Sequence, residues 1–124
     1  MREAIAVAQA SLASNDVPVG ALIVDPSGKI IATGTNEREA KSDPTAHAEI
    51  VAMRKAATNG WRLDNHTLVV TLEPCAMCAG AIAQSRLQTV VFGAWDEKQA
   101  RLDRCGIYCV IHEAPLEPRF GQEF

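Results

Sequence analysis

Two short motifs constrain this chain most, because their side chains must meet in space to act together. They are His47-Ala48-Glu49 and Pro74-Cys75-Ala76-Met77-Cys78. Histidine nitrogen and cysteine sulfur are typical zinc donors, and the motifs supply three of them. A structural zinc site is normally closed by four protein ligands, whereas a catalytic site keeps three and leaves one position open. The fold must therefore bring His47, Cys75 and Cys78 to one ion, with Glu49 as an unligated carboxylate beside it.

The composition predicts one globular domain spanning residues 1–124. A chain of 124 residues is long enough for a real core but too short for two domains. Its apolar runs, such as 17–24 and 90–94, are far shorter than a membrane span, and the first residues do not resemble a signal peptide. We expect a cytoplasmic protein without a membrane partner.

The net charge and the cysteines limit which ligands the chain is expected to bind. A net charge of −3 excludes a protein that coats nucleic acid, although it allows local contact with a few phosphates. In a reducing compartment disulfides are not expected, so metal binding is the favoured interpretation of Cys75 and Cys78. The same argument leaves Cys105 and Cys109 unassigned.

The first third of the chain predicts a helix and a hairpin. Apolar residues at helical spacing indicate a helix from residue 2 to about 14. A β-branched run at 17–24, turn residues at 25–28 and a second run at 30–35 predict an antiparallel hairpin. A polar loop at 36–42 follows.

The remaining elements alternate between helix and strand. Asp43-Pro44 is typical of a helix start, which predicts a helix from there to about residue 58. A strand at 68–72, a helix at 75–85 and strands at 89–92 and 107–112 follow. This order predicts an α/β fold with a mixed central sheet covered by helices on both faces.

The expected elements make one metal site feasible. Cys75 and Cys78 stand three residues apart at a helix start, so both sulfurs lie on one face. His47 and Glu49 stand two apart and can serve the same site only over the amino-terminal end of their helix. Two helix amino termini then face the ion, each equivalent to about half a positive charge, which favours thiolates.

This donor set predicts hydrolytic chemistry. Zinc lowers the pKa of the water that it binds to about 7. Glu49 can take the proton of that water and pass it to a ring nitrogen and then to a departing amine. Alone, a histidine at a helix start is usually a cap, and a Cys-x-x-Cys pair is often structural or redox-active. Together, in this order and separation, the motifs are the signature of zinc deaminases.

Further segments of the sequence extend the pattern beyond the metal motifs. They are Val17-Pro18-Val19-Gly20-Ala21, Asn36, Asp43-Pro44-Thr45-Ala46-His47-Ala48-Glu49-Ile50, Leu72-Glu73-Pro74-Cys75-Ala76-Met77-Cys78-Ala79-Gly80-Ala81 and Phe92-Gly93-Ala94-Trp95-Asp96-Glu97-Lys98. With these segments, about residues 2–98 resemble the bacterial tRNA-specific adenosine deaminase family. This resemblance implies a three-layer α/β/α cytidine-deaminase-like fold, one Zn²⁺ per subunit held by His47, Cys75 and Cys78, and Glu49 as the proton carrier. The implied substrate is the wobble adenosine of a tRNA anticodon loop, converted to inosine by a homodimer.

The resemblance also implies how the base is held. The Ala48 backbone amide and the Asn36 side chain would read the flipped base, and Val17 and Pro18 would line its pocket. Asp96 would lie near the sugar or backbone. The alternatives are a turn role for Asn36 and core packing for Val17 and Pro18. A loop suits base flipping, because its bases are already splayed out.

Residues 99–124 form an atypical tail. After Lys98 the sequence departs from the family pattern. A tail that is divergent, truncated or translated from another reading frame would produce this departure. The metal motifs lie before this point, so the departure bears on the substrate more than on the chemistry.

Two other functions fit part of the pattern. Free-base or nucleoside deaminases acting on guanine or cytosine share the metal motifs. A non-catalytic structural zinc module, with Cys75, Cys78, Cys105 and Cys109 as ligands, is the alternative of another class. It leaves His47 and Glu49 unexplained.

Overall fold

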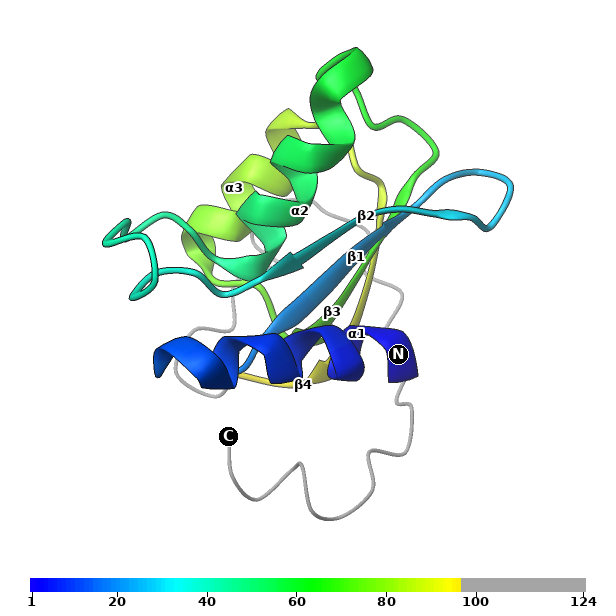
Figure 1. The fold of residues 1–124 in the computed structure, drawn as a ribbon. Coiled ribbons are helices and arrows are strands. Elements are labelled where there is room, and N and C mark those ends of the chain that lie inside the picture. Colours follow the sequence, from blue (N-terminus) through cyan, green and yellow to red (C-terminus); the bar gives the residue numbers. More distant parts are fainter. Residues whose placement is uncertain (97–124) are drawn as a thin grey trace.

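The architecture was obtained from a computed structural model that describes residues 1–96 (Figure 1). The tail at 99–124, including the strand expected at 107–112 and both Cys105 and Cys109, lies outside the described residues. The elements are α1 (Arg2–Ala8), the 3-10 helix η1 (Gln9–Ser14), β1 (Gly20–Val24), β2 (Ile30–Thr35), α2 (Ala48–Ala56), the 3-10 helix η2 (Ala57–Asn59), β3 (Thr67–Leu72), α3 (Ala76–Gln84) and β4 (Thr89–Ala94). None of these helices is long and apolar enough to cross a membrane.

The four strands form one mixed sheet in the order β2-β1-β3-β4. β1 pairs antiparallel with both β2 and β3, and β3 pairs parallel with β4. The parallel pair is connected by α3, as a parallel connection requires a crossover element. The mixed sheet predicted from the sequence is confirmed.

Helices cover the sheet on both faces, and two glycines permit their close approach. A Cβ atom at Gly20 would collide with the α1 backbone at Ala4 and Ala8. A Cβ atom at Gly34 would collide with the α2 backbone at Ala48 and Ala52. Figure 1 shows α2 and α3 side by side, with α1 apart from them. The three-layer α/β/α prediction is confirmed. Within residues 1–96, α1 forms one helical layer, and α2 and α3 form the other.

The hydrophobic core lies between the sheet and the α2–α3 layer. Alternate strand residues point into it, as expected for a sheet with a period of two. Burying one large aliphatic or aromatic side chain contributes about 1.5–3 kcal/mol, so this core holds α2 and α3 firmly in place. Its large members are Ile23, Leu68, Val70, Ile82, Val90 and Phe92.

Two expected boundaries were wrong, and both affect the site. The helix expected from Asp43 begins instead at Ala48, with His47 as N-cap. The Asp43 carboxylate accepts hydrogen bonds from the Thr45 amide at 2.8 Å and hydroxyl at 2.7 Å, and the His47 amide donates to Thr45 O. These local contacts make tight turns, so residues 43–47 do not continue as a helix.

The strand expected at 17–24 begins only at Gly20. Residues 17–19 pair with the loop after β2 instead of with the sheet. The Asn36 side chain donates from Nδ2 to Val17 O at 3.1 Å, and the Asn36 amide donates to Val19 O at 3.2 Å. The helix expected at 2–14 is also divided, because its second half tightens into η1 before Asn15 adopts a left-handed conformation with φ of 60°.

Candidate active site

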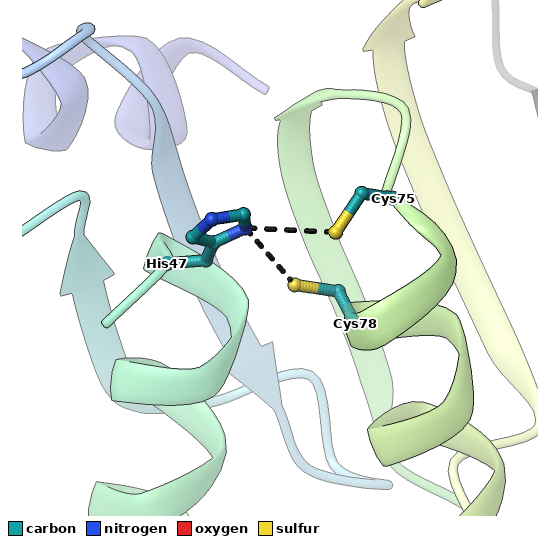
Figure 2. A group of neighbouring side chains, drawn as sticks. All are labelled: His47, Cys75 and Cys78. Carbon is teal, nitrogen blue, oxygen red and sulfur yellow. Dashed lines mark hydrogen bonds between the residues drawn. The ribbon is translucent and has the colours of Figure 1, made fainter. Parts of the chain in front are cut away.

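The three metal-donor residues lie at the starts of two neighbouring helices (Figure 2). His47 is the N-cap of α2 and Cys75 is the N-cap of α3. Cys78 lies in the first turn of α3 and is fully buried. The motifs therefore meet as the sequence analysis predicted, each at a helix amino terminus.

The donor geometry fits zinc. In a tetrahedral site, a nitrogen ligand at about 2.0 Å and a sulfur ligand at about 2.3 Å from the ion lie about 3.5 Å apart. His47 Nδ1 lies 3.6 Å from Cys75 Sγ and 3.5 Å from Cys78 Sγ. All three donor atoms lie within 4.8 Å of one another, and within residues 1–96 no other such group of potential ligands is found. One zinc ion can therefore contact all three donors.

The ionisation states of His47, Cys75 and Cys78 depend on one another, and a bound cation would stabilise both cysteines as thiolates. Hydrogen bonds from Cys78 and from the His47 ring lower the pKa of Cys75 to about 3. The hydrogen bond with Cys75, together with burial, raises the pKa of Cys78. The hydrogen bond with Cys75 also raises the pKa of His47. A second thiolate is unfavourable beside the first, and a divalent ion removes that conflict by stabilising both.

Glu49 is buried beside the donors without belonging to the donor group. It is the second residue of α2 and is 4% exposed. Burial raises the pKa of its carboxyl group. A raised pKa favours proton uptake by this carboxyl group compared with an exposed one, which is the direction that suits a general acid and base.

His47, Glu49 and Cys75 line a cavity of about 350 Å³. The cavity lies where the carboxyl ends of the parallel strands β3 and β4 meet the amino ends of α2 and α3, the usual place for a ligand in an α/β fold. Its lining residues come from the helix starts, from two loops and from the strand ends. They are Asn15, Asp16, Val17, Val19, Asn36, Arg38, Glu39, His47, Ala48, Glu49, Leu72, Glu73, Cys75 and Asp96.

Most of the expected base-binding residues line this cavity. Ala48, Asn36, Val17 and Asp96 do so. Pro18 does not, and the neighbouring Val19 lies there instead. Val17 is 59% exposed, so core packing, its alternative interpretation, does not apply.

The Asn36 side chain already has partners within the protein. Its Nδ2 atom donates to Val17 O at 3.1 Å, and its Oδ1 atom accepts from the Arg38 amide at 3.1 Å. Asn36 therefore has the turn role that was its alternative interpretation, and it has that role at the cavity wall.

Sequence reasoning missed two buried carboxylates in the lining, Asp16 and Glu73, each 4% exposed. Glu73 Oε2 accepts a hydrogen bond from the Asp96 amide at 3.1 Å, so it holds the chain after β4 against the end of β3. Asp16 connects two loops. The available signal for Glu73 was a charged residue at the end of an apolar strand, directly before Pro74-Cys75.

A second cavity shows why donors, rather than size, identify the site. It encloses about 370 Å³ between the distal parts of α2 and α3. Its lining holds no cysteine, histidine or carboxylate. The lining residues are Ile50, Met53, Arg54, Ala57, Trp61, Leu63, Ala81, Gln84 and Ser85.

Comparison with known proteins agrees with this geometry. The sequence model of the cytidine and deoxycytidylate deaminase zinc-binding region matches residues 1–94, which include all three metal donors and Glu49. The chain belongs to the cytidine and deoxycytidylate deaminase family. As a member of this deaminase family it has zinc as its metal, in agreement with the donor geometry.

Individual relatives refine the comparison. The chain is 53% identical over 100 residues to the tRNA-specific adenosine deaminase of Haemophilus influenzae, covering 79% of this chain and 58% of that relative. The chain thus spans little more than half of that protein. A solved structure matches with a TM-score of 0.82 and 33% identity, and the match covers 90% of the present chain and 94% of the matched chain. That structure comes from studies of A-to-I editing by tRNA:A34 deaminases at the wobble position of transfer RNA. The structure of guanine deaminase from Bacillus subtilis matches with a TM-score of 0.73 and 37% identity. This match covers 86% of the present chain and 67% of the guanine deaminase chain.

Proposed function

We propose that this chain is a zinc-dependent hydrolase that converts adenosine to inosine at the wobble position of tRNA. The observation that carries the proposal is a group of three zinc donors with a buried carboxyl group beside it, in the wall of a cavity. The 53% identity to a tRNA-specific adenosine deaminase supports the substrate. The net reaction consumes water and adenosine and releases inosine and ammonia.

In this mechanism His47, Cys75 and Cys78 hold the metal. Bound zinc supplies a Lewis acid that makes water nucleophilic at neutral pH. The Glu49 carboxylate takes up the proton of the attacking water and delivers it to the ring nitrogen next to C6. It then delivers a proton to the amine as that group leaves. Burial of Glu49 supports this role, because it raises the pKa of the carboxyl group and so favours proton uptake.

We assign recognition of the base to the cavity wall. The Ala48 amide lies in the first turn of α2, where amides lack an intrahelical acceptor, so it can donate to the base. Asn36 can donate its second Nδ2 hydrogen, and Val17 offers an exposed apolar surface for the ring, with Pro18 next to it in the chain. Asp96 also lines the cavity, and we assign it to contact with the sugar or backbone of the substrate.

Because the chain has a net charge of −3, it would bind an RNA substrate through a few local contacts with phosphates. Arg38 lines the cavity, and no ion pair within residues 1–96 involves it. Its guanidinium group is therefore available to a phosphate beside a flipped nucleotide. This contact would favour a nucleotide in a strand over a free base.

Free-base deamination is the second candidate, favoured by the 37% identity to a guanine deaminase of known structure. A side-by-side assay of metal-quantified protein on an anticodon stem-loop, guanine and cytosine separates the two. Inosine in the stem-loop, absent with the Glu49→Gln variant, supports the first proposal. Ammonia released only from guanine or cytosine would overturn it.

We further propose that the chain acts in the cytoplasm as a homodimer, as its family resemblance implies. Light scattering coupled to size-exclusion chromatography should give twice the 13.3 kDa chain mass. A value of one chain mass at micromolar concentration would contradict the dimer.

A further inference from the structure

Asp16 joins two segments that are far apart in the sequence. It follows η1 and is 4% exposed. Its Oδ1 atom accepts a hydrogen bond from the Glu39 amide at 2.6 Å. Its Oδ2 atom accepts from the Ala40 amide at 3.2 Å and from the Ser14 hydroxyl at 2.6 Å. Both carboxylate oxygens are thus used, and two of the three donors belong to the loop that follows β2.

The two joined segments are the loop-side wall of the cavity, which we define as residues 15–19 and 36–43. Asn15, Val17 and Val19 line the cavity from the first segment, and Asn36, Arg38 and Glu39 line it from the second. Neither segment is part of a helix or strand. Their relative position therefore depends on a few polar contacts, and the Asp16 carboxylate makes two of them.

Asp16 has no cationic partner within residues 1–96. A buried carboxylate without a counter-charge is unfavourable unless hydrogen-bond donors replace the water that it loses. Burial acts to raise the pKa of Asp16, but the hydrogen bonds from Ser14, Glu39 and Ala40 outweigh it and lower the pKa. The carboxylate is therefore ionised at neutral pH, and hydrogen bonds to an ionised acceptor are roughly twice as strong as neutral ones.

We propose that Asp16 is a positioning residue that holds the loop-side wall together and thereby sets the affinity of the cavity for its substrate. The substrate itself rests on the proposed function. The metal donors and Glu49 lie at the starts of α2 and α3, which pack on the sheet through the hydrophobic core and not through the Asp16 carboxylate. Loss of the Asp16 contacts should consequently raise KM and leave the chemical step nearly unchanged.

The chain contains a matched control for this residue. The Asp25 carboxylate also accepts hydrogen bonds from two backbone amides and one serine hydroxyl, those of Ser27, Lys29 and the Ser27 side chain. Asp25 lies in the exposed turn between β1 and β2 and does not line the cavity. Asp16→Asn and Asp25→Asn therefore remove the charge from carboxylates that accept from the same types of donor. The three donors of Asp25 all bind Oδ1, whereas those of Asp16 use both oxygens, and only the Asp16 set borders the cavity.

The test measures steady-state kinetics on an anticodon stem-loop, zinc content, and amide hydrogen exchange for wild type and both variants. Asp16→Asn should raise KM about tenfold, the equivalent of about 1.4 kcal/mol, with kcat within about twofold and zinc retained. The Glu39 and Ala40 amides should exchange faster in this variant, because they lose an ionised acceptor. Asp25→Asn should leave KM and these amides unchanged. If Asp16→Asn does not fold, Ser14→Ala, which removes one donor and keeps the charge, should raise KM by a smaller factor.

Three outcomes would overturn the proposal. They are equal KM values for Asp16→Asn and Asp25→Asn, a fall in kcat with KM unchanged, and unchanged exchange of the Glu39 and Ala40 amides. If wild-type protein fails to deaminate the stem-loop, the proposed function fails. The exchange measurement then still decides whether Asp16 holds the loop-side wall.

Discussion

The two sides of the cavity are built differently. The metal side consists of His47, Glu49, Cys75 and Cys78, all at the starts of α2 and α3, which pack on the sheet through the hydrophobic core. The loop-side wall, residues 15–19 and 36–43, has no regular structure and is held by side-chain hydrogen bonds of Asp16 and Asn36.

This difference corresponds to the proposed division between reaction and recognition. Groups that must meet an ion within a few tenths of an ångström lie on elements held by extensive apolar burial. The groups to which we assign substrate recognition lie on loops, where sequence can change without moving the metal donors. Substitutions on the metal side should therefore abolish the reaction, and substitutions on the loop-side wall should lower substrate affinity by smaller, variable amounts.

The largest effect is expected from removal of a metal donor. His47→Ala leaves two sulfur donors, which cannot hold a catalytic zinc, so the metal and all measurable deamination should be lost. Cys105→Ser is the matched control and should retain both zinc and activity. Atomic absorption on purified protein checks the metal content. The reverse pattern would instead support the structural zinc module with four cysteines.

Removal of Glu49, the proposed proton carrier, should affect turnover alone. Glu49→Gln keeps the size of the side chain but cannot accept a proton, so kcat should fall about 10²–10⁴-fold. Zinc should stay bound, because Glu49 is outside the donor group. Loss of the metal in this variant would show that Glu49 had been assigned the wrong role.

The dependence of the metal side on packing can be tested at a glycine. Gly34→Ala places a Cβ atom against the α2 backbone at Ala48 and Ala52, and should destabilise the fold by about 1–3 kcal/mol. Gly80→Ala lies in α3 with open space around it and should be neutral or stabilising by up to about 1 kcal/mol. Urea denaturation compares the two. Equal midpoints would mean that α2 can move away from the sheet without cost.

The smallest effect concerns the pH dependence of the loop-side wall. The pKa of Asp16 is lower in the folded protein than the usual value of about 3.9 expected when unfolded. Its ionised form therefore stabilises the folded state above about pH 4, and this contribution is lost as pH falls through the lower folded pKa. The stability difference between wild type and Asp16→Asn should be constant near neutral pH and vanish in acid. A difference that persisted in acid would mean that the charge is unimportant.

The elements with strong local signals were predictable from sequence. β2 has the bounds expected from its β-branched run and flanking turns, and β3 and β4 differ by a few residues at most. The start of α2 was wrong, because Asp43 and Pro44 have the local chemistry of a helix start. The turns made by Thr45 and His47 prevail there, and they bring the His47 ring to Cys75 and Cys78.

By itself, the sequence determined the set of metal donors. The type and spacing of His47, Cys75 and Cys78 indicate a zinc site, because few arrangements of those donors can surround one ion, and the proposed catalytic role of Glu49 follows from its place beside them. Only the tertiary structure decided the shape of the loop-side wall. The partners of Asp16 lie 23 and 24 residues away in the chain, and a hydrogen bond to a backbone amide can involve any residue type. Such a contact leaves no pattern in the sequence, so the residue that ties the two loops of the cavity became visible only once the chain was folded.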